Sequence, residues 1–151
     1  MELQTERLKI VPCTDELLST ISTKDYKIGP HIKMFLEKLR VDSTQLGWGV
    51  WLVIKKENNT IIGDIGFKGK PNSENTVEVG YGIIPSAQNK GYATEAVNEI
   101  INWAFKNDNV DKVVAECLHD NFSSIKVLEK LNMNQIGKVN SMLKWELKKV
   151  R

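Results

Sequence analysis

The sequence predicts one α/β or α+β domain, residues 1–151, with helices on both faces of a central sheet. A chain of 151 residues has the usual size of a single domain and can bury a core without metals or disulfides. Its content of 41% hydrophobic and 26% charged residues is that of an ordinary globular protein. The apolar residues also switch repeatedly between a two-residue period and a helical period, which predicts strands mixed with helices.

The first half of the chain is predicted to form a strand, two helices and two antiparallel strands. Apolar side chains alternate in a strand over residues 3–12, and Thr14 is typical of the N-cap of a short helix. The broken, polar stretch at residues 22–30 is expected to face a ligand, and a second helix follows it. Residues 48–54 and 61–67 are rich in β-forming side chains and are joined by a polar hairpin loop.

The next segment is predicted to be a strand followed by a long helix. Residues 76–84 have the composition of a strand, and Pro85 ends it. From Thr94 onward, apolar residues recur at steps of three and four, which predicts a helix with a wide apolar face. The polar run at residues 107–109 is expected to close this helix.

The last segment is predicted to contain a strand, a helix and one or two final strands. Residues 110–118 form a largely apolar run that suits the centre of a sheet. Ser123 or Ser124 can cap a helix that ends at Leu131. Residues 135–150 supply the last one or two strands.

Composition excludes several classes of function. The net charge of +2 comes from interspersed residues, and the basic cluster at residues 148–151 does not indicate a nucleic-acid surface. No apolar run is long enough for a membrane span, and the charged residues 1–7 do not resemble a secretory signal, so we expect a cytoplasmic protein with no membrane partner. Cys13 and Cys117 lack nearby cysteine or histidine neighbours, so neither a disulfide nor a metal site is expected.

The junction at residues 83–96 has the features of an anion-binding site. A strand is followed by a helix through a loop that contains Gly91. Unpaired N–H groups and the positive end of the helix dipole attract phosphates at a helix start, and glycine permits close approach of the backbone. The nucleotide P-loop pattern is absent, and the glycines at residues 80 and 82 lack the third glycine of the dinucleotide fingerprint.

The junction resembles the acetyl-CoA motif of GNAT superfamily N-acetyltransferases, [Q/R]-x-x-G-x-[G/A], with Gln88, Gly91 and Ala93 at the specified positions. The T-E-R-L segment at residues 5–8 and the E-V-G-Y segment at residues 78–81 resemble the ribosomal-protein alanine acetyltransferase (RimJ/RimL-type) branch. Residues 121–130 match the N-x-x-S-x-x-V-L-E-K segment of that branch. These matches cover nearly the whole chain in the correct order.

The resemblance implies a mixed, mostly antiparallel sheet of six to seven strands, splayed between the fourth and fifth strands to admit acetyl-CoA. The implied activity is transfer of the acetyl group to a primary amine, on a protein N-terminus or a small molecule, by direct attack in a ternary complex. A monomer or homodimer without a metal is expected. The alternatives are a non-catalytic acyl-CoA-binding regulatory module, and an enzyme that uses a longer acyl-CoA or an O-linked acceptor.

The resemblance also implies the residues that bind the cofactor. Backbone amides from Asn89 to Thr94 would hold the pyrophosphate, Ile83 and Ile84 would pair with the pantetheine arm, and Asn121 would hydrogen-bond it. The alternative is that Gly91 only permits a tight turn and that Ala93 only packs. The predicted cofactor-binding residues are Ile83, Ile84, Gln88, Asn89, Lys90, Gly91, Tyr92, Ala93, Thr94 and Asn121.

Two residues are candidates for catalysis. Direct transfer needs a neutral amine, and Glu78 stands near the position of a glutamate base in related enzymes, although it can equally be a solvated or salt-bridged side chain. Ser124 would lie near the sulfur and protonate the departing thiolate, although a serine at this place can equally serve a turn or an N-cap. A backbone N–H near Ile83 would stabilise the oxyanion. Neither cysteine has an evident base partner, so no acyl-enzyme is expected.

Overall fold

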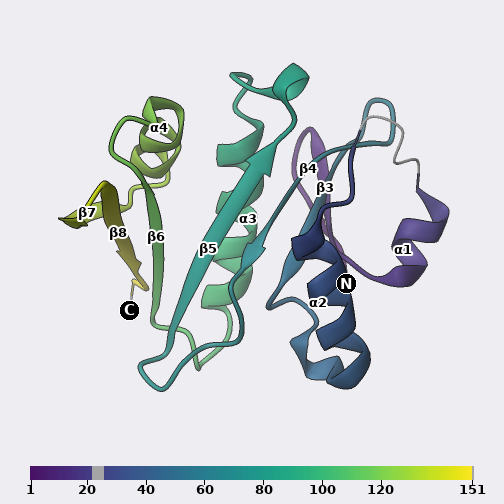
Figure 1. Ribbon diagram of the computed structural model, residues 1–151, viewed down its shortest axis with the longest axis horizontal. Coiled ribbons are helices and arrows are strands. Elements are labelled where there is room, and N and C mark those ends of the chain that lie inside the picture. Colours follow the sequence, from purple (N-terminus) through teal and green to yellow (C-terminus); the bar gives the residue numbers. More distant parts are fainter. Residues whose placement is uncertain (22–25, 151) are drawn as a thin grey trace.

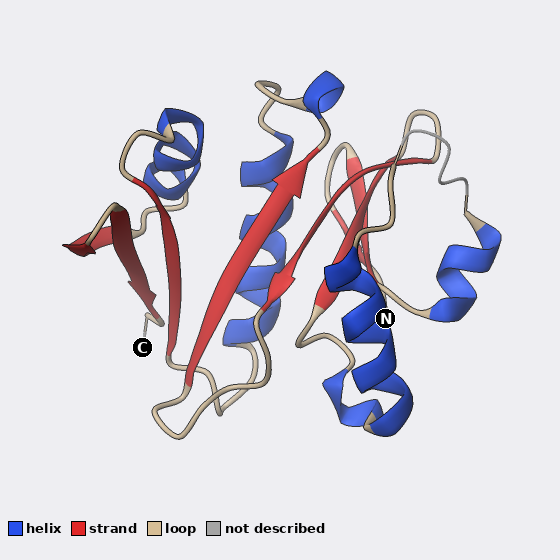
Figure 2. Cartoon of the chain, viewed as in Figure 1, coloured by secondary structure: helices blue, strands red, loops and turns tan. Residues whose placement is uncertain are grey.

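The computed structural model describes residues 1–21 and 26–150, and in these ranges it contains one eight-stranded sheet, four α-helices and two short 3-10 helices (Figures 1 and 2). The strands lie in the order β1-β2-β3-β4-β5-β6-β8-β7, and every neighbouring pair is antiparallel except β5 and β6. Part of the stretch at residues 22–30, which the sequence predicts to face a ligand, lies outside the described residues. The elements are β1 (Leu3–Gln4), β2 (Leu8–Pro12), α1 (Asp15–Thr20), α2 (Pro30–Val41), η1 (Ser43–Gln45), β3 (Val50–Lys55), β4 (Thr60–Phe67), β5 (Thr76–Ile83), η2 (Pro85–Ala87), α3 (Tyr92–Phe105), β6 (Lys112–Leu118), α4 (Phe122–Lys130), β7 (Asn134–Val139) and β8 (Met142–Lys148).

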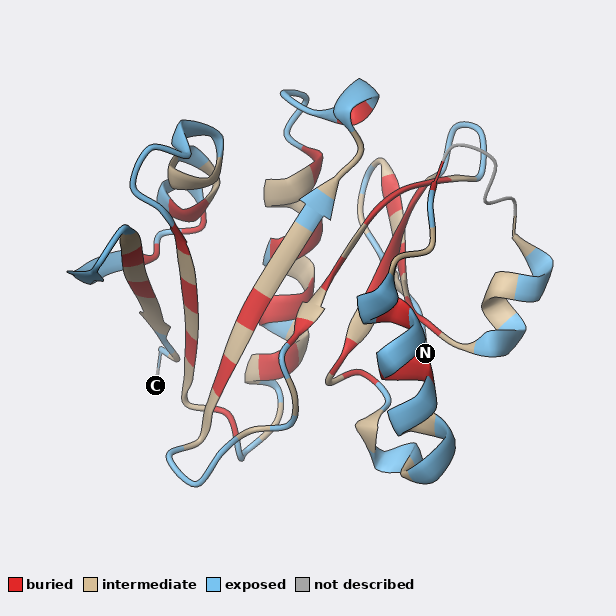
Figure 3. Cartoon of the chain, in the orientation of Figure 1, coloured by how far each residue is buried: buried red, intermediate tan, exposed pale blue. Residues whose placement is uncertain are grey.

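Strand β3 separates the two hydrophobic cores of the domain. Trp51 and Val53 belong to the larger core with the apolar face of α3, whereas Leu52 and Ile54 belong to a smaller core with α2. Successive side chains of a strand point to opposite faces, so the two cores lie on opposite faces of the sheet. Helices therefore cover both faces, as the sequence predicts, and Figure 3 shows that the buried positions of α3 face the sheet.

The sheet opens between β5 and β6. Three register pairs join these parallel strands, and the last of them joins Glu78 to Val114. Beyond this pair, β5 continues to Ile83 and β6 continues to Leu118 without pairing to each other in the described part of the chain. The two strands diverge in Figure 1, with α4 at the outer end of β6. The predicted splay between the fourth and fifth long strands is confirmed.

The sheet has eight strands, whereas the sequence predicts six or seven. The opening segment at residues 3–12 is two strands, because the N–H of Thr5 donates to the carbonyl of Leu8 and turns the chain between β1 and β2. The final segment forms both β7 and β8, which pair as a hairpin. Strand β5 ends at Ile83, one residue earlier than predicted.

Two helices begin earlier than predicted, and in each case the cap explains the difference. Helix α3 begins at Tyr92 rather than at Thr94, because Gly91 adopts the left-handed conformation (φ +82°) that allows the chain to turn into the helix. Helix α4 begins at Phe122, because the side chain of Asn121, and not of Ser123 or Ser124, accepts from a backbone N–H of the first turn.

Candidate active site

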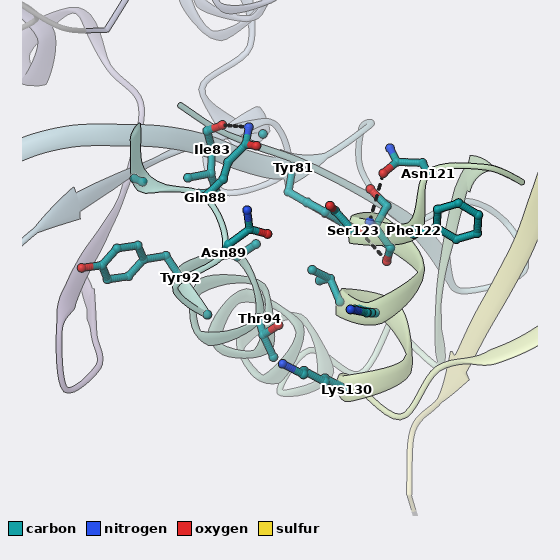
Figure 4. A pocket seen from close by; sticks show the side chains of 17 residues that line it. Tyr81, Ile83, Gln88, Asn89, Tyr92, Thr94, Asn121, Phe122, Ser123 and Lys130 are labelled. Atoms are coloured by element: carbon teal, nitrogen blue, oxygen red, sulfur yellow. Dashed lines mark hydrogen bonds between the residues drawn. The ribbon is translucent and has the colours of Figure 1, made fainter. Parts of the chain in front are cut away.

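A cavity of about 720 Å³ lies where β5 and β6 diverge. Its wall comes from the end of β5, the loop that follows, the first turn of α3 and one face of α4 (Figure 4). Large concave sites of this kind usually bind small molecules. The lining residues are Tyr81, Gly82, Ile83, Ala87, Gln88, Asn89, Gly91, Tyr92, Ala93, Thr94, Asn121, Phe122, Ser123, Ser124, Lys126, Val127 and Lys130.

The start of α3 offers unpaired backbone N–H groups to this cavity. The N-cap is Gly91, and among the described residues no side chain caps this helix. The N–H of Glu95 bonds to the carbonyl of Gly91, whereas the amides of the first turn before it have no partner within the helix. Asn89 also has a positive φ of 63°. Such a loop followed by an uncapped helix start forms a concave anion site, which the helix dipole reinforces.

Gln88 connects the loop to the end of β5. Its side-chain Nε2 donates to the carbonyl of Ile83 at 2.8 Å, as the dashed line in Figure 4 shows. Ile83 lines the cavity, but Ile84 does not. The N–H of Ile84 donates to Ile62 and its carbonyl accepts from Ala87, so both of its backbone polar groups are already used inside the protein.

A side chain from the opening segment holds the loop from behind. The guanidinium of Arg7 donates to the carbonyl of Lys90 at 2.9 Å, pairs with Glu95 at 2.7 Å and lies 4.2 Å from the ring centroid of Tyr92. Lys90 therefore points its carbonyl toward Arg7 and does not line the cavity. Burial raises the pKa of the Glu95 carboxyl, but hydrogen bonds from Thr5 and Arg7 more than offset this effect and lower that pKa.

The facing wall of the cavity is formed by α4 and the residue before it. Oδ1 of Asn121 accepts from the N–H of Ser124 at 3.1 Å, and its Nδ2 can still donate to a ligand. Ser124 lines the cavity, and its carbonyl accepts from the hydroxyl of Tyr81 at 3.4 Å. Burial raises the pKa of Tyr81, and the side chain of Ser124 partly counteracts this rise.

Two exposed lysines, Lys126 and Lys130, lie one turn apart on α4 and line the same cavity. Figure 4 shows the Lys130 side chain extending toward Thr94 at the start of α3. The cavity thus combines unpaired amides on one wall with cations on the other. Sequence reasoning did not identify these lysines, although their four-residue spacing on a predicted helix was a usable signal. Tyr81 was likewise not predicted from the sequence to line the site, and no role was predicted for Arg7 within the T-E-R-L segment.

Glu78 lies outside the lining of the cavity. Its carboxylate pairs with Lys68 at 2.7 Å. Alternation along β5 puts its side chain on the same face as Gly80 and Gly82, the face opposite to α3. A Cβ at Gly80 would meet the Lys68 side chain at 3.7 Å, and one at Gly82 would meet nothing within 4 Å. This face of β5 is therefore open at Gly82, whereas the Lys68 side chain lies beside Gly80 and Glu78.

The structure thus brings together most of the residues that the sequence proposes for the site. Among the predicted residues, Ile84, Lys90 and Glu78 are outside the cavity lining. The predicted residues that line the cavity are Ile83, Gln88, Asn89, Gly91, Tyr92, Ala93, Thr94, Asn121 and Ser124.

Within residues 1–21 and 26–150, no group of three or more histidine, cysteine, aspartate or glutamate side chains is placed to hold a metal ion. None of the helices in the same ranges combines the length and the apolar character that crossing a bilayer requires.

The sequence matches known proteins. The model of the acetyltransferase (GNAT) domain matches residues 12–134. The uncharacterized N-acetyltransferase YjdG of Bacillus subtilis (strain 168) is 39% identical over 100 residues, which are 66% of this chain and 60% of the relative. YnaD of the same organism, also an uncharacterized N-acetyltransferase, is 34% identical over 105 residues, 70% of this chain and 59% of the relative. The chain thus spans about 60% of the length of these curated relatives.

Solved structures share the fold at low sequence identity. A ribosomal-protein-S5-alanine acetyltransferase from Vibrio fischeri superposes with a TM-score of 0.78 at 19% identity, covering 98% of this chain and 96% of that one. RimL, a ribosomal L7/L12 alpha-N-protein acetyltransferase in complex with coenzyme A, superposes with a TM-score of 0.76 at 13% identity, covering 98% of both chains. At these identities the likeness shows the fold alone.

Proposed function

Because the chain belongs to the GNAT acetyltransferase family, we propose that it transfers the acetyl group of acetyl-CoA to a primary amine by direct attack in a ternary complex. The acceptor is a protein N-terminus or a small-molecule amine. The observation that carries the proposal is the uncapped start of α3, whose amides face a large cavity at the opening of the sheet. An anion fits this position, and the phosphates of acetyl-CoA are anions.

We assign the parts of the cofactor to the walls of the cavity by their chemistry. The amides from Gly91 to Thr94 would receive the pyrophosphate, and Lys126 and Lys130 would add cations for the phosphate groups. The edge of β5 beyond Glu78 is unpaired toward β6, with the Ile83 carbonyl accepting from Gln88, so an amide-containing pantetheine arm can take the place of a strand along this edge. Nδ2 of Asn121 would donate to this arm from the opposite wall.

The proposed reaction has one nucleophilic step. The amine nitrogen attacks the thioester carbonyl carbon, a C–N bond forms, the C–S bond breaks, the amine loses a proton and the thiolate gains one. We assign removal of the amine proton to Glu78 through water, since Glu78 and Gly82 lie on the same face of β5 and a side chain at Gly82 would meet no atom within 4 Å. We assign protonation of the thiolate to Ser124, which lines the cavity. A backbone N–H near Ile83 is the proposed oxyanion donor.

We further place this activity in the cytoplasm. Cys13 and Cys117 are both free thiols in the interior, which fits a reducing compartment.

Calorimetric titration with acetyl-CoA tests the proposal. The parent should bind, and Gly91→Glu should lose binding, because a side chain strains the left-handed backbone at this position and its carboxylate repels the nearby phosphates. Gly137→Glu is the matched control, since a side chain at Gly137 meets no atom within 4 Å. A parent that does not bind acetyl-CoA would refute the proposal.

Turnover separates an enzyme from a regulatory acyl-CoA-binding module. Release of free CoA is measured with peptides bearing free N-termini and with spermidine as acceptors, for the parent, Glu78→Gln and Ser124→Ala. Loss of turnover with retained acetyl-CoA binding supports the two assigned roles. Unchanged turnover in both variants removes these residues from the mechanism, and a parent that binds acetyl-CoA without acetylating any amine favours the module.

A further inference from the structure

Three carboxylates occupy the face of β4, β5 and β6 that lies opposite to α3, and one of them differs from the others. Glu78 pairs with Lys68, and Glu116 pairs with Lys144. Asp64 on β4 has no such cation: among the described residues, no lysine or arginine forms an ion pair with it. It contacts two side chains that are not permanently charged.

Those two side chains fix the orientation of the Asp64 carboxylate. The hydroxyl of Tyr26 donates to Oδ2, and Nε2 of His31 lies 2.9 Å from Oδ1. Burial and the hydrogen bond to Asp64 raise the pKa of Tyr26, so the phenol remains a donor. Each carboxylate oxygen can accept two hydrogen bonds, so Oδ1 and Oδ2 of Asp64 can each still accept one from a ligand. The Asp64 side chain is 22% exposed, so a ligand can reach it.

The negative charge of Asp64 also acts on its surroundings. The thiol of Cys13 has its pKa raised to about 12 by burial and then by the charges of Asp64 and Asp15. A cation bound at Asp64 would form the kind of ion pair that lysines already form with Glu78 and Glu116.

Asp64 stands beside the opening of the sheet. Its register partner across the β4–β5 ladder is Gly82, and Gly82 also lines the large cavity. A side chain at Gly82 would meet no atom within 4 Å, so the space next to the Asp64 carboxylate is open on this face. Further along this face of β5, the Lys68 side chain lies beside Gly80 and pairs with Glu78.

We propose that Asp64, held by Tyr26 and His31, binds the ammonium group of the acceptor and positions it over Gly82 at the opening of the sheet. This inference rests on the proposed acetyltransferase function and extends it to the acceptor. A primary amine reaches the protein mainly as a cation at neutral pH, so an anionic side chain beside the site would attract it before the base acts. Asp64 takes that role. Glu78, through water, removes one proton to give the neutral amine, and the second proton, lost as the C–N bond forms, passes to the thiolate by way of Ser124. The acceptor class is therefore a cationic primary amine with an unhindered ammonium group.

Kinetics of Asp64→Asn test the inference. The variant keeps the size of the side chain and an oxygen for Tyr26, but loses the charge. The KM for the acceptor should rise about 10- to 100-fold, because the variant loses one charge-assisted hydrogen bond to the ammonium group. The Kd for acetyl-CoA should stay within about twofold of the parent value. Glu116→Gln, a lysine-paired carboxylate on the same face, should behave like the parent. An acceptor KM within about twofold of the parent in Asp64→Asn overturns the inference.

A second measurement does not require turnover. The chain has two histidines, His31 and His119, so the imidazole NMR signals can be assigned with His31→Gln. Titration with spermidine and with free N-terminal peptides, with and without acetyl-CoA, should move the His31 signals of the parent and leave those of His119. The shift should disappear in Asp64→Asn. A parent that binds acetyl-CoA but shows no His31 shift with any amine refutes the Asp64 role alone, whereas a parent that binds no acetyl-CoA refutes the proposed function.

Discussion

Nε of Arg7 lies 2.7 Å from Oε1 of Glu95, and the two residues are 88 positions apart in the sequence. Thr5 also donates its hydroxyl to Glu95, and Arg7 contacts both the carbonyl of Lys90 and the ring of Tyr92. The turn between β1 and β2 is thereby attached to the first turn of α3. The position of the loop before α3 consequently depends on a segment that does not line the cavity.

Removing the charge of Glu95 should loosen this attachment. In Glu95→Gln the hydrogen bonds from Arg7 lose their charge assistance, so the loop is held less firmly before the ligand arrives. We expect the Kd for acetyl-CoA to rise about three- to tenfold, equivalent to about 1 kcal/mol. Calorimetry measures the change, with Glu99→Gln, one turn further along α3, as the control. Equal affinities of Glu95→Gln and the parent would show that the attachment does not position the loop.

The same carboxylate should make stability depend on pH. The pKa of Glu95 is lowered in the folded protein from its ordinary value of 4.5, so the ionised form is the one that folding favours. Its contribution is therefore fully present above about pH 4.5 and is lost as the pH falls through the folded pKa. Urea unfolding of the parent and Glu95→Gln between pH 7 and pH 3 measures this. The stability advantage of the parent should shrink over the acidic part of the range, and an advantage independent of pH contradicts the prediction.

Gly91 should resist substitution even by alanine. Its φ of +82° lies in the left-handed region, where a Cβ costs about 1–2 kcal/mol, and the added atom would stand 3.4 Å from Nη2 of Arg7. Gly91→Ala should lower the free energy of unfolding by about 1 kcal/mol and weaken acetyl-CoA binding. Denaturation with urea checks the first effect. Gly137→Ala, at a position with open space and no positive φ, should show neither effect.

Lys126 and Lys130 should act through the phosphates of the cofactor. The double change to alanine is expected to raise the Kd for acetyl-CoA about tenfold at low salt and to reduce the salt dependence of binding, because two cations are removed from an exposed site. Acetyl-pantetheine, which carries no phosphate, should bind the parent and the variant alike. Lys138→Ala, an exposed lysine on β7, is the control. Equal weakening for both ligands would instead indicate a general disturbance of α4.

The features that the sequence predicted correctly are local ones. The loop around Gln88 and Gly91 could be identified because a helix start and its preceding glycine are encoded within a few neighbouring residues. The order of long strands and helices follows from apolar periodicity for the same reason. The split of the opening strand escaped prediction because the hydrogen bonds at Thr5 carry no signal in the apolar pattern.

Contacts between distant segments could not be predicted in this way. Tyr26 and Asp64 are 38 positions apart, and His31 and Asp64 are 33 apart. Each of these side chains is ordinary in its own neighbourhood, and the packing of Tyr26 and of α2 against the sheet brings them together. The ion pair of Glu78 with Lys68 depends likewise on the path of the loop between β4 and β5. Sequence alone therefore left the role of Glu78 open.

The opening between β5 and β6 has a consequence for the protein without its ligand. A closed ladder would bury its backbone donors and acceptors, but here the two facing strands present unpaired edges in the interior of the sheet. Exposed edges of this kind can recruit strands from other molecules, and a bound extended ligand would cover them. Ligand occupancy should therefore protect this fold against self-association as well as against unfolding, so purified protein should stay monodisperse longest when the cofactor is present.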